Sequence, residues 1–200
     1  MLKFLPFFCL SFLFACRNPT KDLSAKQLHD SVILLTRHYQ DTSQFTAAIK
    51  LLERAIEVDS NYFDAHASKF YLEVSLGDFG NAARNANQMI RLKPDSAELY
   101  LLAGMFEQLA DDTIPAMHHF SQSVLLYKLT LDTMNAANQY WWATWKNSAL
   151  AMIMSGQEKV LHDFLKEHCE TAVDSSLYDV KTLSKNKDAL VKEFRKKYER

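Results

Sequence analysis

Apolar side chains recur every third or fourth residue along most of the chain, and short polar segments interrupt them. This spacing predicts amphipathic α-helices that each bury one face. An early helix begins near Ser24, because the order Ser-Ala-Lys-Gln has the spacing of a capping box. Polar turns are expected at 41–43 and 59–61. Between them, the clearest helix runs over about 45–58, and its apolar side is formed by Ala48, Leu51, Leu52, Ala55 and Ile56.

The helical pattern repeats every 34 residues. Three rows of residues keep this step: Ala48, Ala82 and Ala116; Ala55, Met89 and Ser123; and Val58, Leu92 and Leu126. A repeat unit of this length holds two antiparallel helices. The two helices cannot bury their apolar faces alone, so neighbouring units must stack. The repeat predicts helix pairs at about 29–60, 63–94 and 97–128. We expect buried rows at Leu52, Ala86 and Phe120 and at Ala55, Met89 and Ser123.

The repeat resembles the tetratricopeptide family in its step and at several positions. The family's alanine, early in the second helix of each unit, matches Ala48, Ala82 and Ala116. The turn between the two helices matches Leu76-Gly77-Asp78-Phe79, and the proline that closes a unit is matched once, by Pro94. The resemblance covers about half of the chain. It implies an all-α fold, a right-handed α-solenoid of antiparallel helix pairs, with an unrelated bundle of helical hairpins as the alternative.

Some positions depart from the family pattern in the first helix of each unit. The family's small residue in the middle of that helix matches Gly104 but is replaced by Thr36 and Phe70 in the other units. The aromatic residue that follows is Tyr39 in the first unit, whereas the other two units carry glutamates, Glu73 and Glu107. These departures suggest that the first helix of the middle unit is shifted by one residue.

The phase of the repeat slips after Leu126. A long helix is expected at about 132–155, followed by Gly156 and a second amphipathic helix, as a degenerate fourth pair within 132–170. A last helix is expected at about 186–198. Trp141 and Trp145 fall on one face of the long helix, where they either close the end of the core or form a binding platform for a peptide or glycan.

Residues 1–16 form a separate segment. One lysine precedes a long apolar run, which is the arrangement of an export signal and is too short to span a bilayer as a mature helix. Its ending, Leu13-Phe14-Ala15-Cys16, resembles the lipobox of bacterial lipoproteins. That resemblance implies cleavage before Cys16 and acylation of the Cys16 thiol, which holds a protein on a membrane surface. An ordinary secretory signal is the alternative.

The residue after the lipobox bears on location. Arg17 stands where an aspartate would retain such a lipoprotein in the inner membrane of enteric bacteria. The resemblance therefore implies a lipid-anchored protein of the bacterial cell envelope, at the outer membrane. Residues 17–23 then form a polar tether, and 24–200 form the helical domain.

The charge distribution argues against nucleic acid as a partner. The formal net charge is −1 and becomes about −2 once Lys3 is removed with the signal. The segment 181–200 is different, because it holds eight Lys or Arg against three Asp or Glu. Such a run is usually a solvated helix face, and it could also meet anionic lipid headgroups.

The sequence carries no recognisable arrangement of catalytic residues. It has no zinc-protease motif, no nucleophile elbow and no phosphate-binding glycine loop, and its seven histidines form no complete metal-ligand set. We therefore expect no cofactor, no metal and no enzymatic activity. The expected function is a binding scaffold or assembly factor, and the alternative is an envelope enzyme or glycan-binding protein with an unrecognised site.

The resemblance also implies where a partner binds. In the family, side chains from the first helix of each unit line a concave groove. The matching positions here are Arg37, Tyr71 and Met105, with Leu101 one turn earlier and Gln40 and Gln108 nearby. This mixed lining suits a protein or peptide segment with apolar anchors and a few hydrogen bonds. The alternative is that Tyr71 and Met105 simply pack against the next helix.

Overall fold

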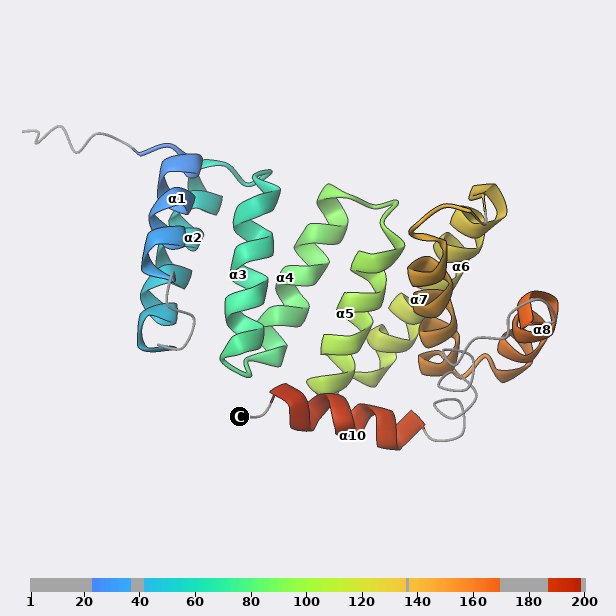
Figure 1. Ribbon diagram of the computed structural model, residues 1–200. Helices are drawn as coiled ribbons and strands as arrows, with labels where there is room; N and C mark the ends of the chain where they lie inside the picture. Colours follow the sequence, from blue (N-terminus) through green and yellow to red (C-terminus); the bar gives the residue numbers. More distant parts are fainter. Residues whose placement is uncertain (1–22, 37–41, 136, 170–186, 199–200) are drawn as a thin grey trace, which may run out of the picture.

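The computed structural model describes residues 23–36, 42–135, 137–169 and 187–198 (Figure 1). Its regular elements are α-helices and one short 3-10 turn within these ranges. They are α1 (Ala25–Leu35), η1 (Thr42–Gln44), α2 (Phe45–Val58), α3 (Phe63–Ser75), α4 (Phe79–Leu92), α5 (Ala97–Leu109), α6 (Thr113–Thr133), α7 (Trp141–Met154), α8 (Glu158–Cys169) and α10 (Lys187–Tyr198).

Each helix from α1 to α8 packs against the next one in the chain. Figure 1 shows the result, a row of helix pairs in which α1, α3, α5 and α7 follow one another along one side. This is the tetratricopeptide-like α-solenoid that the repeat predicted. None of the helices in the described part of the chain has the length and apolar character needed to cross a bilayer.

The helices begin and end at local signals in the sequence. Ser24 caps α1 in a capping box with Gln27, as expected from their spacing. Gly77 ends the α3 region with a left-handed φ of 71°, and the side chain of Asp78 then accepts the backbone N–H of Asn81 at the start of α4. These signals end α3 and begin α4 within a short turn, so the two helices can pack against each other.

The two rows that were predicted to be buried lie between the helices, and so does the alanine row. Ala48, Ala82 and Ala116 are each 0% exposed, because two helices approach closely at these positions. The row Leu52, Ala86 and Phe120 is buried, as is the row Ala55, Met89 and Ser123. The third unit shows how close the helices come, since a Cβ added to Gly104 would lie 2.8 Å from the Phe120 ring.

The departures from the family pattern have a packing explanation. The side chains at two equivalent pairs of positions differ in size in opposite directions. In the third unit small Gly104 faces large Phe120, whereas in the second unit large Phe70 shares a core cluster with small Ala86. Interiors are packed to crystal-like density, so a larger residue on one helix requires a smaller one opposite. The predicted one-residue shift in the middle unit is wrong, because α3 and α5 begin and end at equivalent positions of the repeat.

The region after the third unit differs from the expected boundaries. Helix α6 continues to Thr133, and α7 begins only at Trp141, instead of one long helix over 132–155. Two asparagines divide them: the side chain of Asn135 accepts the N–H of Ala137 at 2.8 Å, and that of Asn138 accepts the N–H of Tyr140 at 2.9 Å. Such bonds compete with the helix ladder. The residues that shift the phase of the repeat after Leu126 therefore lengthen α6. Helices α7 and α8 form the fourth pair.

Candidate peptide-binding site

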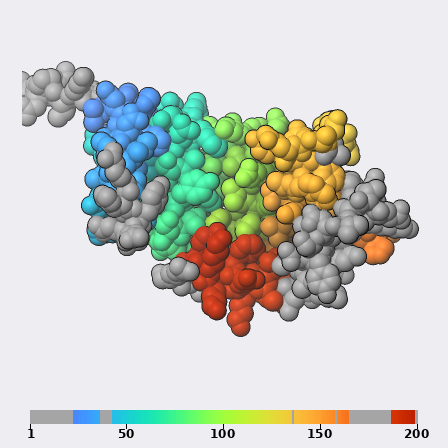
Figure 2. Space-filling view, viewed as in Figure 1, coloured from blue at the N-terminus to red at the C-terminus, as the bar shows by residue number. Residues whose placement is uncertain are grey.

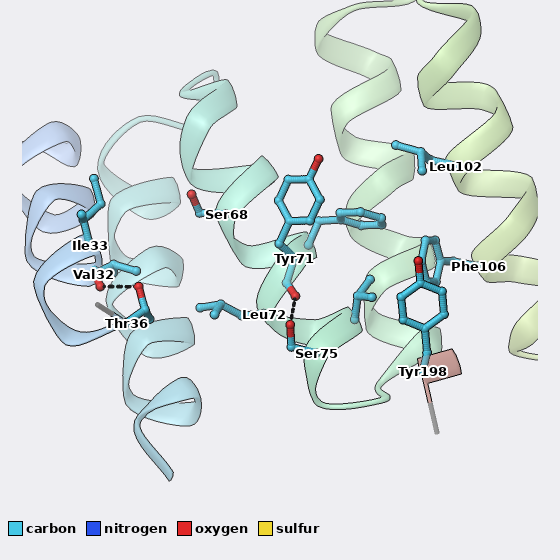
Figure 3. A pocket seen from close by; sticks show the side chains of 12 residues that line it. Val32, Ile33, Thr36, Ser68, Tyr71, Leu72, Ser75, Leu102, Phe106 and Tyr198 are labelled. Atoms are coloured by element: carbon cyan, nitrogen blue, oxygen red, sulfur yellow. Dashed lines mark hydrogen bonds between the residues drawn. The ribbon is translucent and has the colours of Figure 1, made fainter. Parts of the chain in front are cut away.

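A cavity of about 540 Å³ opens on the side of the solenoid formed by α1, α3, α5 and α7, which we call the A-helix face. None of the twelve lining residues carries a charged side chain. We call this cavity the A-face pocket (Figure 3). Its lining is Val32, Ile33, Thr36, Ser68, Phe70, Tyr71, Leu72, Val74, Ser75, Leu102, Phe106 and Tyr198.

The Thr and Ser hydroxyl groups of the lining are turned toward the protein's own polar groups. Thr36 donates to the carbonyl of Val32 at 2.9 Å, and Ser75 donates to the carbonyl of Tyr71 at 2.8 Å. Ser68 Oγ lies 2.8 Å from Nε2 of His29. Because these hydroxyls already have partners, the pocket offers mainly methyl groups and aromatic surface to a ligand.

Two large apolar side chains stand exposed at the pocket. Tyr71 on α3 is 63% exposed and Ile33 on α1 is 55% exposed. The ring of Tyr71 is braced by an edge-on contact with Phe70, with 5.4 Å between their centroids. At the other end, Phe106 and Tyr198 face each other with centroids 5.9 Å apart (Figure 3). Exposed apolar side chains grouped around a cavity are typical of an interaction site.

The residues predicted to line the groove lie in different environments. Tyr71 lines the pocket, whereas Arg37, Gln40 and the proposed lipidation residue Cys16 lie outside the described residues. Leu101 is only 4% exposed and belongs to the core that the fourth helix pair covers, so its side chain does not reach the surface. Leu102, the next residue, lines the pocket instead.

Met105 and Gln108 lie under another part of the same chain. Together with Leu109 and Met154 they form a small crevice whose remaining walls are Val191 and Phe194 of α10. In the third unit, the A-helix face is therefore occupied by the protein's own C-terminal helix. Nothing in the repeat pattern indicated this, because α10 lies far from α5 along the chain and outside the repeat.

The tryptophan cluster is mostly part of the core. Trp145 is 0% exposed, and its ring stacks on Phe164 of α8 with 5.5 Å between centroids. Trp141 packs against the same core and is partly buried. Trp142 is 37% exposed. The interpretation that the cluster closes the end of the solenoid is correct for Trp145, which is not available as a binding platform.

Ionisable groups gather on the opposite side of α3, where they bind one another. Glu73 is 3% exposed, and burial raises its pKa, although the nearby Lys69 ammonium at 3.3 Å opposes this shift. Asn85 donates to the backbone carbonyl of His66 at 2.8 Å. In the described residues, no three His, Cys, Asp or Glu side chains are grouped so as to hold a metal ion. These contacts are those of a satisfied structural network.

Comparisons with known proteins add little at this level of similarity. No profile of a known protein family matches the chain, and no curated protein matches it. Among solved structures, the crystal structure of MamA protein is similar over 86% of this chain and 87% of its own, with 14% sequence identity and a TM-score of 0.48. At that score the superposition does not by itself establish a shared fold. The solenoid assignment rests on the helix pairs of this chain.

Proposed function

We propose that this protein is a protein-binding scaffold rather than an enzyme, and that its A-face pocket receives apolar side chains of a protein partner. The observation that carries the proposal is the uncharged pocket of about 540 Å³ with Tyr71 and Ile33 exposed beside it. A pocket of this size accommodates two or three side chains of a peptide segment. A tetratricopeptide-like solenoid presents such a pocket on a rigid row of helices, which lowers the entropic cost of binding.

We further propose that the scaffold acts in the bacterial cell envelope, at the outer membrane, held there by lipid on Cys16. The support is the apolar run that ends in Leu13-Phe14-Ala15-Cys16 and is followed by Arg17. The partner is then an envelope protein. The basic C-terminal segment is compatible with anionic headgroups at that surface.

The test of the binding site uses a photo-crosslinking amino acid, p-benzoylphenylalanine, placed at Tyr71 in cells. Tyr140 is the matched control, because it is also 63% exposed but does not line the pocket. Irradiation is expected to yield a discrete protein adduct from position 71 and none, or a much weaker one, from position 140. Equal adducts from both positions, or none from position 71, would contradict the proposed site.

A further inference from the structure

Helix α10 shows how the A-helix face holds a helix. In Figure 1 it crosses the lower ends of α5 and α7, and Figure 2 shows it, in red, covering the lower part of α5. Its inward side is apolar: Leu190 is 7% exposed, and Val191, Phe194 and Tyr198 are partly buried against the core. Leu190, Phe194 and Tyr198 follow one another at every fourth position, so they form one stripe of the helix.

Two cations on α10 cap the helices beneath it. Lys187 Nζ donates to the backbone carbonyl of Met154, the last residue of α7. Arg195 Nη2 donates to the carbonyl of Leu109, the last residue of α5, at 3.0 Å and to Asp111 at 2.8 Å. The last carbonyls of a helix lack partners within it and carry partial negative charge, so they attract cations.

The spacing of these two cations matches the spacing of the solenoid. Lys187 and Arg195 are separated by just over two helical turns, which is roughly 12 Å along a helix axis. That length carries α10 from the end of α7 to the end of α5, the adjacent helices of the A-helix face. The carbonyl of Tyr198 then reaches the α3–α4 turn, where it would lie 3.8 Å from a Cβ on Gly77. Helix α10 thus stops where the A-face pocket begins.

The pocket repeats part of this arrangement on α3, one unit before α5. Its floor contains Thr36, at the end of α1, and Ser75, which holds in α3 the repeat position that Leu109 holds in α5. Tyr71 occupies the position that Met105 occupies under α10. Phe106 and Tyr198 belong both to the seat of α10 and to the pocket, so the two sites are continuous.

We propose that the occupant of the A-face pocket is a basic amphipathic helix of a protein partner, laid in line with α10. The apolar residues of this helix, one turn apart, enter the A-face pocket in the way that Val191 and Phe194 pack into the crevice beside Met105. A Lys or Arg residue of that helix caps the end of α3 as Arg195 caps the equivalent end of α5. This inference rests on the proposed function and adds the chemistry of the partner.

The probe is a fluorescein-labelled peptide with the α10 sequence, residues 187–198, titrated with the full chain and followed by fluorescence anisotropy. Saturable binding is expected, and the double variant Ile33→Ala with Tyr71→Ala should weaken it at least tenfold. A peptide carrying Phe194→Ala, and a peptide in which each Lys and Arg is replaced by Gln, should both bind at least tenfold more weakly. A scrambled peptide of the same composition controls for charge alone, and circular dichroism checks that the variant chain is folded.

Three outcomes would overturn the inference. The first is no saturable binding, and the second is equal binding of the scrambled peptide. The third is binding that survives the Ile33→Ala, Tyr71→Ala change but tightens in the chain with Arg195→Ala, because the peptide would then be replacing α10. A crosslinked partner at Tyr71 combined with failure of the basic peptide would retain the proposed function and reject only the helix chemistry.

Discussion

At the scale of single residues, the polar interior follows the repeat as closely as the apolar rows do. Glu73 lies near Asn85, 3.5 Å from its amide nitrogen, and Glu107 lies 2.7 Å from the ring of His119. The two pairs occupy equivalent positions in successive units. Each glutamate is buried and hydrogen-bonded to the second helix of its unit, which is how a buried carboxyl is tolerated. The family's aromatic position has thus become a polar one.

The buried carboxyl of Glu73 predicts a pH dependence of stability. Burial raises its pKa above the ordinary value of 4.5, so the folded state binds the proton more tightly than the unfolded state does. This contribution to stability is fully present below pH 4.5 and is lost as pH rises through the folded-state pKa. We expect Glu73→Gln to be more stable, relative to wild type, at pH 7 than at pH 4.

Urea denaturation of both proteins at several pH values measures this difference. The exposed Glu57 provides the control, since Glu57→Gln should leave the pH profile of the wild type unchanged. Parallel profiles for Glu73→Gln and wild type would show that burial of this carboxyl does not influence folding.

At the scale of secondary-structure elements, the fourth helix pair closes the core. Leu131 of α6 and Trp145 of α7 belong to one cluster with Leu161 and Phe164 of α8. Leu190 of α10 joins the same cluster, so the last helix also helps to seal it. A solenoid has two open ends, and its terminal units must bury the apolar face that has no further neighbour.

Trp145 should therefore carry much of the stability of this end. Trp145→Ala removes a fully buried indole that stacks on Phe164, and we expect it to lower the free energy of unfolding by about 3–5 kcal/mol. Trp142→Ala is the matched control on the same helix, with a smaller expected loss because Trp142 is 37% exposed. Chemical denaturation of both variants measures the two losses, and equal losses would mean that the indole of Trp145 is not the anchor.

At the scale of the whole molecule, one part of the A-helix face is covered and another part is open. Helix α10 covers the ends of α5 and α7, and the A-face pocket remains over α1 and α3. The pocket lies on the N-terminal units, on the side of the chain that leads back to Cys16.

The proposed anchor makes a prediction for the intact protein. Cys16→Ala is expected to abolish incorporation of labelled palmitate and to leave an unprocessed precursor that keeps the apolar run of residues 1–16. Cys9→Ala is the matched control, because Cys9 lies within the apolar run and should leave labelling intact. Undiminished labelling of Cys16→Ala would exclude acylation at this residue.

The amino-acid sequence by itself determined the helices of the three repeat units, their pairing and the buried rows. These features depend on short-range signals: apolar residues such as Leu52 at helical spacing, the cap at Ser24, and a constant step that brings Ala48, Ala82 and Ala116 into equivalent places. The position of Tyr71 on the A-helix face was implied by the resemblance to the tetratricopeptide family. A periodic pattern determines which side of a helix is buried because that depends only on residues within a few turns.

Only the tertiary structure decided what covers each part of the A-helix face. Leu101 fills the predicted groove phase yet is buried, because the fourth pair packs over it, and Met105 lies under α10. These outcomes depend on contacts between residues far apart in the chain. Periodicity carries no information about such contacts, since a helix with one apolar stripe can dock on any complementary surface of the right shape.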